Sequence, residues 1–183
     1  MKSTTTLNGV DTAALVNTVH AIQKDPSLAQ CKFRARNQWI EGGHNCATVK
    51  EFYAAGQEDT TRRKPFELKT DEPPVLLGVD RGANPVEYLL SALSGCMTTS
   101  MVYHAAANGV KIDELESEFE GDLDLQGFLG LSKSVRPGFQ AIRATFRVKT
   151  DGSIEQLESY TKFSPVFDVV SRSVPVSVRI EKK

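Results

Sequence analysis

Three cysteines are the residues of this sequence best suited to covalent chemistry: Cys31, Cys46 and Cys96. Three is an odd number, and too few to form the disulfide framework of a small secreted domain. The N-terminal segment also carries Asn8 and Asp11, where a secretion signal needs an unbroken apolar stretch. We therefore expect a cytoplasmic protein whose thiols stay reduced.

A reactive thiol needs a nearby cation or helix dipole that lowers its pKa, and an opening to solvent. Cys96 lies inside an uncharged segment, where a free cysteine more often packs as a small buried hydrophobe. Cys31 and Cys46 are interpreted as unreactive strand thiols; pairing with Cys96 would need Cα atoms about 4.4–6.8 Å apart. A metal site built from His44, Cys46, Cys96 and His104 is disfavoured, because close ligand pairs such as Cys-x-x-Cys are missing and the sequence has only one His-x-Cys pair.

The element that must position Cys96 is a helix predicted over residues 84–107. Asn84 suits the N-cap, Pro85 the first helical position and Glu87 the third, as in a capping box. Because no charged residue follows until His104, the helix is expected to be central and buried on all sides. Small residues recur every fourth position and would let another helix or subunit approach closely: Ser91, Gly95 and Thr99.

Two long strands follow this helix in the prediction. The strand beginning at Leu115 alternates acidic and apolar residues as far as residue 125, with Asp124 on the acidic face. The strand over residues 139–150 alternates basic and apolar residues, so the two would pair with opposite charges on the wet face.

The other predicted elements complete an α+β fold, in which helices pack on antiparallel sheet. Two segments are predicted to be loops, residues 56–63 and 71–74. The expected helices and strands are a helix over 11–23, a hairpin within 31–53 turning at Gly42-Gly43, a short strand over 65–69, a helix over 153–162, a short helix after Ser164-Pro165, and a final strand from Val174.

Length and charge limit the function classes. The chain has 183 residues, 22 Lys and Arg against 23 Asp and Glu, and a formal net charge of -1. This balance gives no electrostatic basis for binding nucleic acid, and no apolar run approaches the roughly 20 residues that span a bilayer. We expect one domain over residues 1–183, with residues 1–29 as an N-terminal helical extension.

The run from Gly82 to Thr98, GANPVEYLLSALSGCMT, resembles the OsmC/Ohr family of thiol-dependent peroxidases. The similarity continues through GDLDLQGFLGL, residues 121–131, and through FSPVFDVV and VPVSVRI near the C-terminus. It covers the chain from about Phe33 onward. The resemblance implies antiparallel β-sheets wrapped around central helices in an intertwined homodimer, with active sites at the subunit interface and no cofactor. It also implies that a reactive cysteine, here Cys96, reduces hydroperoxides, organic ones above all.

The sequence departs from the family pattern at several positions. Ser164 stands where the peroxidases have a second, resolving cysteine, and a serine cannot form a disulfide. Val86 follows the Asn-Pro pair where the family commonly has Glu, and the acid here is Glu87. Similar proteins have an arginine at the position of Cys46. The candidates for the arginine that activates the thiol are Arg36, our choice for the site, with Arg34 and Arg81.

Two functional hypotheses follow. In the first, Cys96 reduces a hydroperoxide in a one-cysteine cycle, and an external thiol reductant replaces the missing partner at Ser164. In the second, the fold is not catalytic and binds a small apolar or thiol-reactive ligand at the dimer interface. Oxidation of Cys96 by an organic hydroperoxide separates the two hypotheses.

Overall fold

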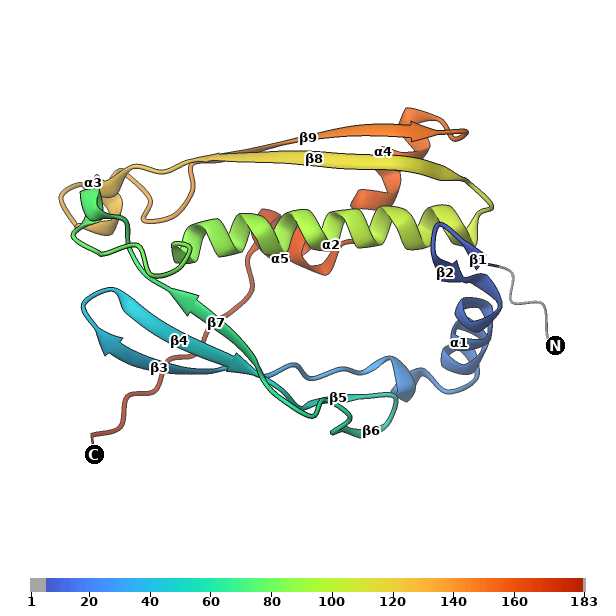
Figure 1. Cartoon of the computed structure of the whole chain (residues 1–183), viewed down its shortest axis with the longest axis horizontal. Coiled ribbons are helices and arrows are strands. Elements are labelled where there is room, and N and C mark those ends of the chain that lie inside the picture. The colour runs from blue at the N-terminus through green and yellow to red at the C-terminus, as the bar shows by residue number, and fades with distance from the viewer. Residues whose placement is uncertain (1–5, 183) are drawn as a thin grey trace. The chain divides into compact units, whose positions relative to one another are not determined.

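The computed structural model describes residues 6–182, so the first five residues of the predicted N-terminal extension lie outside it. The chain packs as two compact units, residues 11–89 and residues 6–10 with 90–182. The helices and strands are labelled in Figure 1. The single domain expected over residues 1–183 stays a prediction.

The first unit holds the N-terminal helix and a three-stranded antiparallel sheet of order β3-β4-β7. Asp11 caps α1 by accepting a hydrogen bond from the backbone N–H of Ala14, which confirms the predicted helix. The Gly42-Gly43 turn and the short strand after it are likewise confirmed, because β3 pairs with β4 and β4 with β7. Its elements are α1 (Thr12–Lys24), η1 (Pro26–Ala29), β3 (Arg36–Glu41), β4 (His44–Val49), β5 (Phe52–Ala54), β6 (Gln57–Asp59), β7 (Phe66–Thr70) and η2 (Pro74–Leu76).

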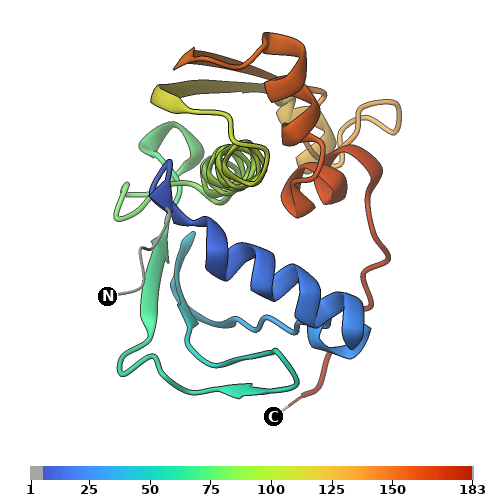
Figure 2. The same cartoon turned by 90° about the vertical axis from the view of Figure 1, so that its right-hand side faces the viewer.

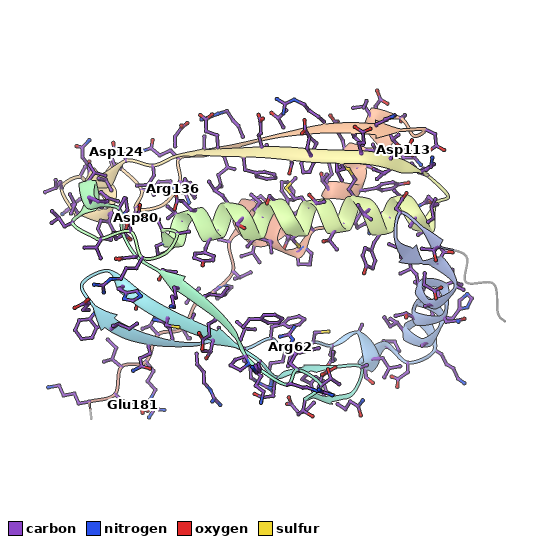
Figure 3. The ribbon with its side chains drawn as sticks, viewed as in Figure 1. Arg62, Asp80, Asp113, Asp124, Arg136 and Glu181 are labelled. Atoms are coloured by element: carbon purple, nitrogen blue, oxygen red, sulfur yellow. The ribbon has the colours of Figure 1, made fainter. Side chains whose placement is uncertain are left out.

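The sequence predicts a loop over residues 56–63, and this prediction is only partly correct. The strand β6 forms within these residues and pairs with β5. Arg62 stabilises this region. Its guanidinium carbon lies 4.9 Å from the ring centroid of Phe52 and 5.3 Å from that of Phe66. It also donates a 3.0 Å hydrogen bond to the carbonyl of Lys50. The cation therefore joins the short hairpin to the three-stranded sheet, where Figure 3 labels it.

The second unit is built on α2 (Pro85–Ala107), which begins in the first unit and continues into this one. Figure 2 looks along this helix, with β8 and β9 over one side of it and α4 and α5 beside it. The other elements are β1 (Thr6–Leu7), β2 (Val10–Asp11), β8 (Ile112–Asp122), α3 (Leu125–Phe128), β9 (Ala141–Thr150), α4 (Ile154–Thr161) and α5 (Pro165–Arg172). The α+β fold class is confirmed.

The core of this unit joins α2, α4 and the inner face of the sheet. Its buried members come from both helices and the turn after α2: Met101, Ala105, Val110, Leu157 and Tyr160. The inner-face side chains Leu115, Phe146 and Val148 pack against it. The apolar alternation seen in the two strands is therefore the alternation that covers this core.

The outer face of β8 and β9 carries the predicted charge pairs, and its side chains project away from α2 (Figure 3). Arg147 donates to Glu118 at 2.9 and 3.2 Å, and Arg143 donates to Asp122 at 2.6 and 2.7 Å. Hydrogen bonding to Arg143 holds the pKa of the Asp122 carboxyl below its usual range. These pairs are exposed, so each contributes little net stability.

Two predictions for strand residues are wrong. Asp124 does not continue β8; it caps α3 and accepts a hydrogen bond from the backbone N–H of Gln126. Residues 174–181 have no assigned strand, although their apolar side chains alternate. A strand needs a hydrogen-bonded neighbour, which alternation alone does not supply. Within the described residues, no helix is both long and apolar enough to cross a membrane.

Asp71 is the buried charged residue that shapes the loop before α2, with 1% of its surface exposed. Its carboxylate accepts hydrogen bonds from the backbone N–H groups of Glu72, at 2.8 Å, and Arg81, at 3.1 Å. Burial acts to raise the pKa of this carboxyl, but hydrogen bonds from Arg81, Glu72 and Val79 outweigh burial and leave the pKa below its ordinary value.

Replacing Asp71 by asparagine is expected to lower the melting temperature at pH 7. Because the folded-state pKa is depressed, the carboxylate stabilises the fold above the unfolded pKa of about 3.9. That contribution is lost as the pH falls through the still lower folded-state value. Thermal melts of Asp71→Asn and wild type should therefore differ at pH 7 and converge toward pH 3. The exposed Asp80→Asn is the control, and equal melting of wild type and Asp71→Asn at pH 7 would contradict this role.

Candidate functional site

The start of α2 is fixed by side chains around Asn84. The Asn84 Oδ1 accepts from the backbone N–H of Val86 at 2.8 Å, and the Asn84 N–H donates to the Glu87 carboxylate at 2.8 Å. The Asn84 amide also donates to the Glu72 carboxylate. The predicted cap is thus present, and these contacts give Glu87 a structural task at the helix start.

Gly82 belongs to the same arrangement and explains one residue of the motif. A Cβ atom at Gly82 would lie 2.2 Å from the carbonyl oxygen of Lys69, so no larger residue fits there. The Tyr88 hydroxyl donates to that same carbonyl at 3.0 Å. The motif before Cys96 therefore joins the end of β7 to the first turn of α2.

Cys96 lies in the twelfth position of α2 and is partly exposed. It borders the buried stripe of Leu93, Met97 and Met101, which faces the core. The sequence predicts a helix buried on all sides, and this prediction is wrong. Its small residues form an exposed stripe, and nothing lies within 4 Å of a Cβ atom built on Gly95. Partial exposure gives the Cys96 thiol a route to solvent that a core cysteine lacks.

The helix dipole does not activate Cys96, because that field falls off within the first turn. A depressed thiol pKa at this position would need a cation brought from elsewhere. The three candidate arginines differ sharply in how they are held. An arginine that is not already bound by a carboxylate is the better candidate to stabilise a thiolate.

Arg34 and Arg81 are both engaged by carboxylates. Arg34 binds Glu58 through both guanidinium nitrogens, at 2.7 and 2.6 Å. Arg81 pairs with Glu41, and its Nη1 lies 3.3 Å from His44 Nδ1. The hydrogen bonds that Arg34 donates to Glu58 raise the pKa of Arg34, and the hydrogen bond that Arg81 donates to Glu41 raises the pKa of Arg81. These partners are 24 and 40 residues away in the sequence, so a local sequence pattern does not predict them.

Arg36 is exposed on β3, where it lies opposite Thr48. Over residues 6–182 it forms no ion pair within 4.0 Å. Its charge contributes, after Lys50 and the backbone, to lowering the pKa of the Glu51 carboxyl. Arg36 therefore remains the least engaged of the three guanidinium groups.

Ser164 is buried, with 1% of its surface exposed, and caps α5. Its Oγ accepts a 3.1 Å hydrogen bond from the backbone N–H of Phe167. The predicted break and short helix are confirmed, and Pro165 occupies the first turn. The position where the resemblance implies a second cysteine is occupied by Ser164, whose hydroxyl caps the start of α5.

We expect Ser164→Ala to reduce the free energy of unfolding by about 1 kcal/mol, because the cap is lost and the Phe167 N–H is left without a partner. Urea denaturation followed by circular dichroism measures the change. Ser159→Ala, at an exposed site on α4, should stay within roughly 0.5 kcal/mol of wild type. A Ser164→Ala variant as stable as wild type would show that the cap has no energetic role.

The other two cysteines are free thiols, Cys31 exposed and Cys46 half-buried on β4. Cys46 lies opposite Gln38 and Lys69 in the sheet. Among the described residues, no group of three His, Cys, Asp or Glu side chains is arranged to hold a metal ion.

Comparison with known proteins places the motif in context. Residues 78–179 match the family model for OsmC-like proteins. None of the curated proteins matches the sequence significantly.

Solved structures share the fold. An OsmC-like protein from Mycoplasma pneumoniae is 16% identical, with a TM-score of 0.57 over 77% of this chain and 88% of that chain. The organic hydroperoxide resistance protein OsmC from Legionella pneumophila is 14% identical, with a TM-score of 0.50 over 78% of this chain and 90% of that one. At these identities the likeness concerns the fold.

Proposed function

Because this chain belongs to the family of OsmC-like proteins, we propose that it reduces hydroperoxides, organic ones above all, with Cys96 as the nucleophile. The observation that carries the proposal is the partly exposed thiol of Cys96 within the matched region. A small hydroperoxide is the substrate, and the protein serves defence against oxidative stress. The reaction belongs in the cytoplasm, where thiols are kept reduced.

The first step is a two-electron oxidation of sulfur. The Cys96 thiolate attacks the outer oxygen of the hydroperoxide, an S–O bond forms and the O–O bond breaks. The leaving alkoxide takes a proton and departs as an alcohol, and Cys96 becomes a sulfenic acid. Arg36 is our proposed cation for the thiolate, since Arg34 and Arg81 are held by Glu58 and Glu41. Glu87 acts as a positioning residue at the helix start.

The second step needs an external thiol, because Ser164 offers no sulfur. That thiol attacks the sulfenic sulfur, water leaves, and a mixed disulfide forms on Cys96. A second external thiol then attacks the mixed disulfide, releasing Cys96 as a thiol and the reductant as its own disulfide. Sulfur is thus oxidised and reduced once in each cycle.

Peptide mapping tests this one-cysteine cycle. The reduced protein receives one equivalent of cumene hydroperoxide, then one equivalent of 2-mercaptoethanol, and is digested without reduction. A mixed disulfide on Cys96 is expected. A disulfide from Cys96 to Cys31 or Cys46 would contradict the one-cysteine cycle, because a cysteine of the protein itself would then act in place of the external thiol. Unmodified Cys96 would favour the second hypothesis, in which the protein binds a small ligand without turnover. The structural role of Ser164 as a helix cap supports that second hypothesis.

We also propose that the protein is a homodimer. Two exposed features support this: the uncharged stripe of small residues on α2, and the apolar side chains of residues 174–180. A second copy packed against these surfaces would cover them.

Gly95→Leu tests the dimer, because the added side chain enters open space in one protomer. We expect sedimentation to show a dimer for wild type and mainly monomer for this variant, since the leucine would separate the facing helices. Circular dichroism checks that the protomer stays folded. A folded Gly95→Leu variant that dimerises as strongly as wild type would place the interface elsewhere.

A further inference from the structure

A separate hollow lies within the second unit, bounded by α2, β9 and α4. Its volume is about 230 Å³. The floor and walls are apolar, formed mainly by Met97, Met101, Phe146, Val148 and Leu157. Met97, Met101 and Leu157 are 7%, 3% and 2% exposed, so the floor is part of the folded core. Cys96 is not among the lining residues.

The polar groups of the hollow come from one side of it. Glu158 and Thr161 line it from α4, and the Thr161 hydroxyl already donates to the backbone carbonyl of Glu158 at 2.8 Å. The Glu158 carboxylate has no ion pair within residues 6–182, although Lys162 follows one turn later. The hollow thus combines an apolar floor with one free negative charge.

We propose that this hollow binds a small amphiphilic amine, with its apolar body against Met97 and Met101 and its ammonium group at Glu158. A cavity of this size accepts a short alkyl or aryl chain. A carboxylate is an acceptor only, so it selects a cationic donor over an anion. The apolar walls favour an amine that carries an alkyl or aryl group over a small amine without one. This binding is independent of peroxide chemistry at Cys96.

The methionines make the test direct. The chain has three, and Met97 and Met101 both line the hollow. Protein labelled with ¹³C at the methionine methyl groups is titrated with hexylamine, hexan-1-ol and hexanoate, with NMR as the readout. We expect saturable shifts of the Met97 and Met101 signals, hexylamine binding at least about threefold tighter than hexan-1-ol, and hexanoate weakest.

Variants locate the two halves of the site. Glu158→Gln should abolish the preference for hexylamine over hexan-1-ol, whereas Glu116→Gln, on the outer face of the sheet, should preserve it. Ala144→Leu adds bulk inside the hollow and should prevent binding of all three probes, whereas Thr145→Leu, on the opposite face of β9, should not. Cys96→Ser should bind hexylamine as wild type does, so failure of the peroxidase proposal leaves this one standing.

Three results would overturn the proposal. The first is the absence of saturable shifts at Met97 and Met101, as expected if a second copy fills the hollow. The second is equal affinity for hexylamine and hexanoate. The third is an amine preference that survives Glu158→Gln.

Discussion

Cys96→Ser is expected to abolish hydroperoxide consumption in the presence of an external thiol, leaving only the rate of the protein-free mixture. The hydroxyl of serine is not a nucleophile at neutral pH without an activating base, and it cannot cycle through a sulfenic acid. Loss of cumene hydroperoxide, followed with 2-mercaptoethanol as reductant, measures the effect. This is the largest change in activity that the proposed function predicts.

Two matched variants make the result specific. Cys31→Ser and Cys46→Ser remove the other thiols and should retain wild-type turnover, because neither is needed in a one-cysteine cycle. Circular dichroism of Cys96→Ser confirms that the fold persists, as expected for an isosteric change at a partly exposed position. Full activity of a folded Cys96→Ser variant would remove Cys96 from the reaction.

Leu157→Ala should have the largest effect on stability. Leu157 is 2% exposed and belongs to the cluster that joins α4 to α2. Truncation removes buried apolar surface and leaves a cavity, so the free energy of unfolding should fall by about 2–5 kcal/mol. Urea denaturation measures the change.

Ile154→Ala, on the same helix, is the control for this truncation. Ile154 is 56% exposed, and its truncation should cost less than about 1 kcal/mol. Equal losses for Leu157→Ala and Ile154→Ala would contradict the assignment of Leu157 to the core.

The elements predicted correctly from sequence carry their own boundary signals. The helix that holds Cys96 begins where Asn84, Pro85 and Glu87 stand in capping positions, and the structure shows those hydrogen bonds. The break before α5 follows in the same way from Ser164 and Pro165. Such features depend on residues adjacent in the chain, so local pattern is sufficient to find them.

The wrong predictions involve partners that the sequence does not specify. The C-terminal alternation from Val174 predicts a strand, but none of the described strands pairs with it. Because α2 lacks charge, its sequence predicts burial on all sides, yet Ser91, Gly95 and Thr99 are exposed. In both cases the sequence pattern identifies a face suited to burial. Periodicity does not identify which segment packs against that face.

The candidate site was only partly predictable for the same reason. Cys96 emerged from the resemblance and not from its position in an uncharged helix, which favours a buried thiol. The engagement of Arg34 by Glu58 depends on tertiary contacts, as does that of Arg81 by Glu41. Arg36 is already the choice from the sequence, and these contacts leave its guanidinium group the least engaged of the three.

The most direct test of Cys96 as the nucleophile is its rate of oxidation in a single turnover. A Cys31→Ser/Cys46→Ser double variant is mixed with cumene hydroperoxide, quenched with dimedone at successive times and weighed by mass spectrometry. Full ionisation alone would speed a thiol of ordinary pKa up to roughly 30-fold at pH 7. We therefore predict a dimedone adduct on Cys96 forming at least about tenfold faster than on free cysteine. A rate no faster than that of free cysteine at the same pH would contradict the account.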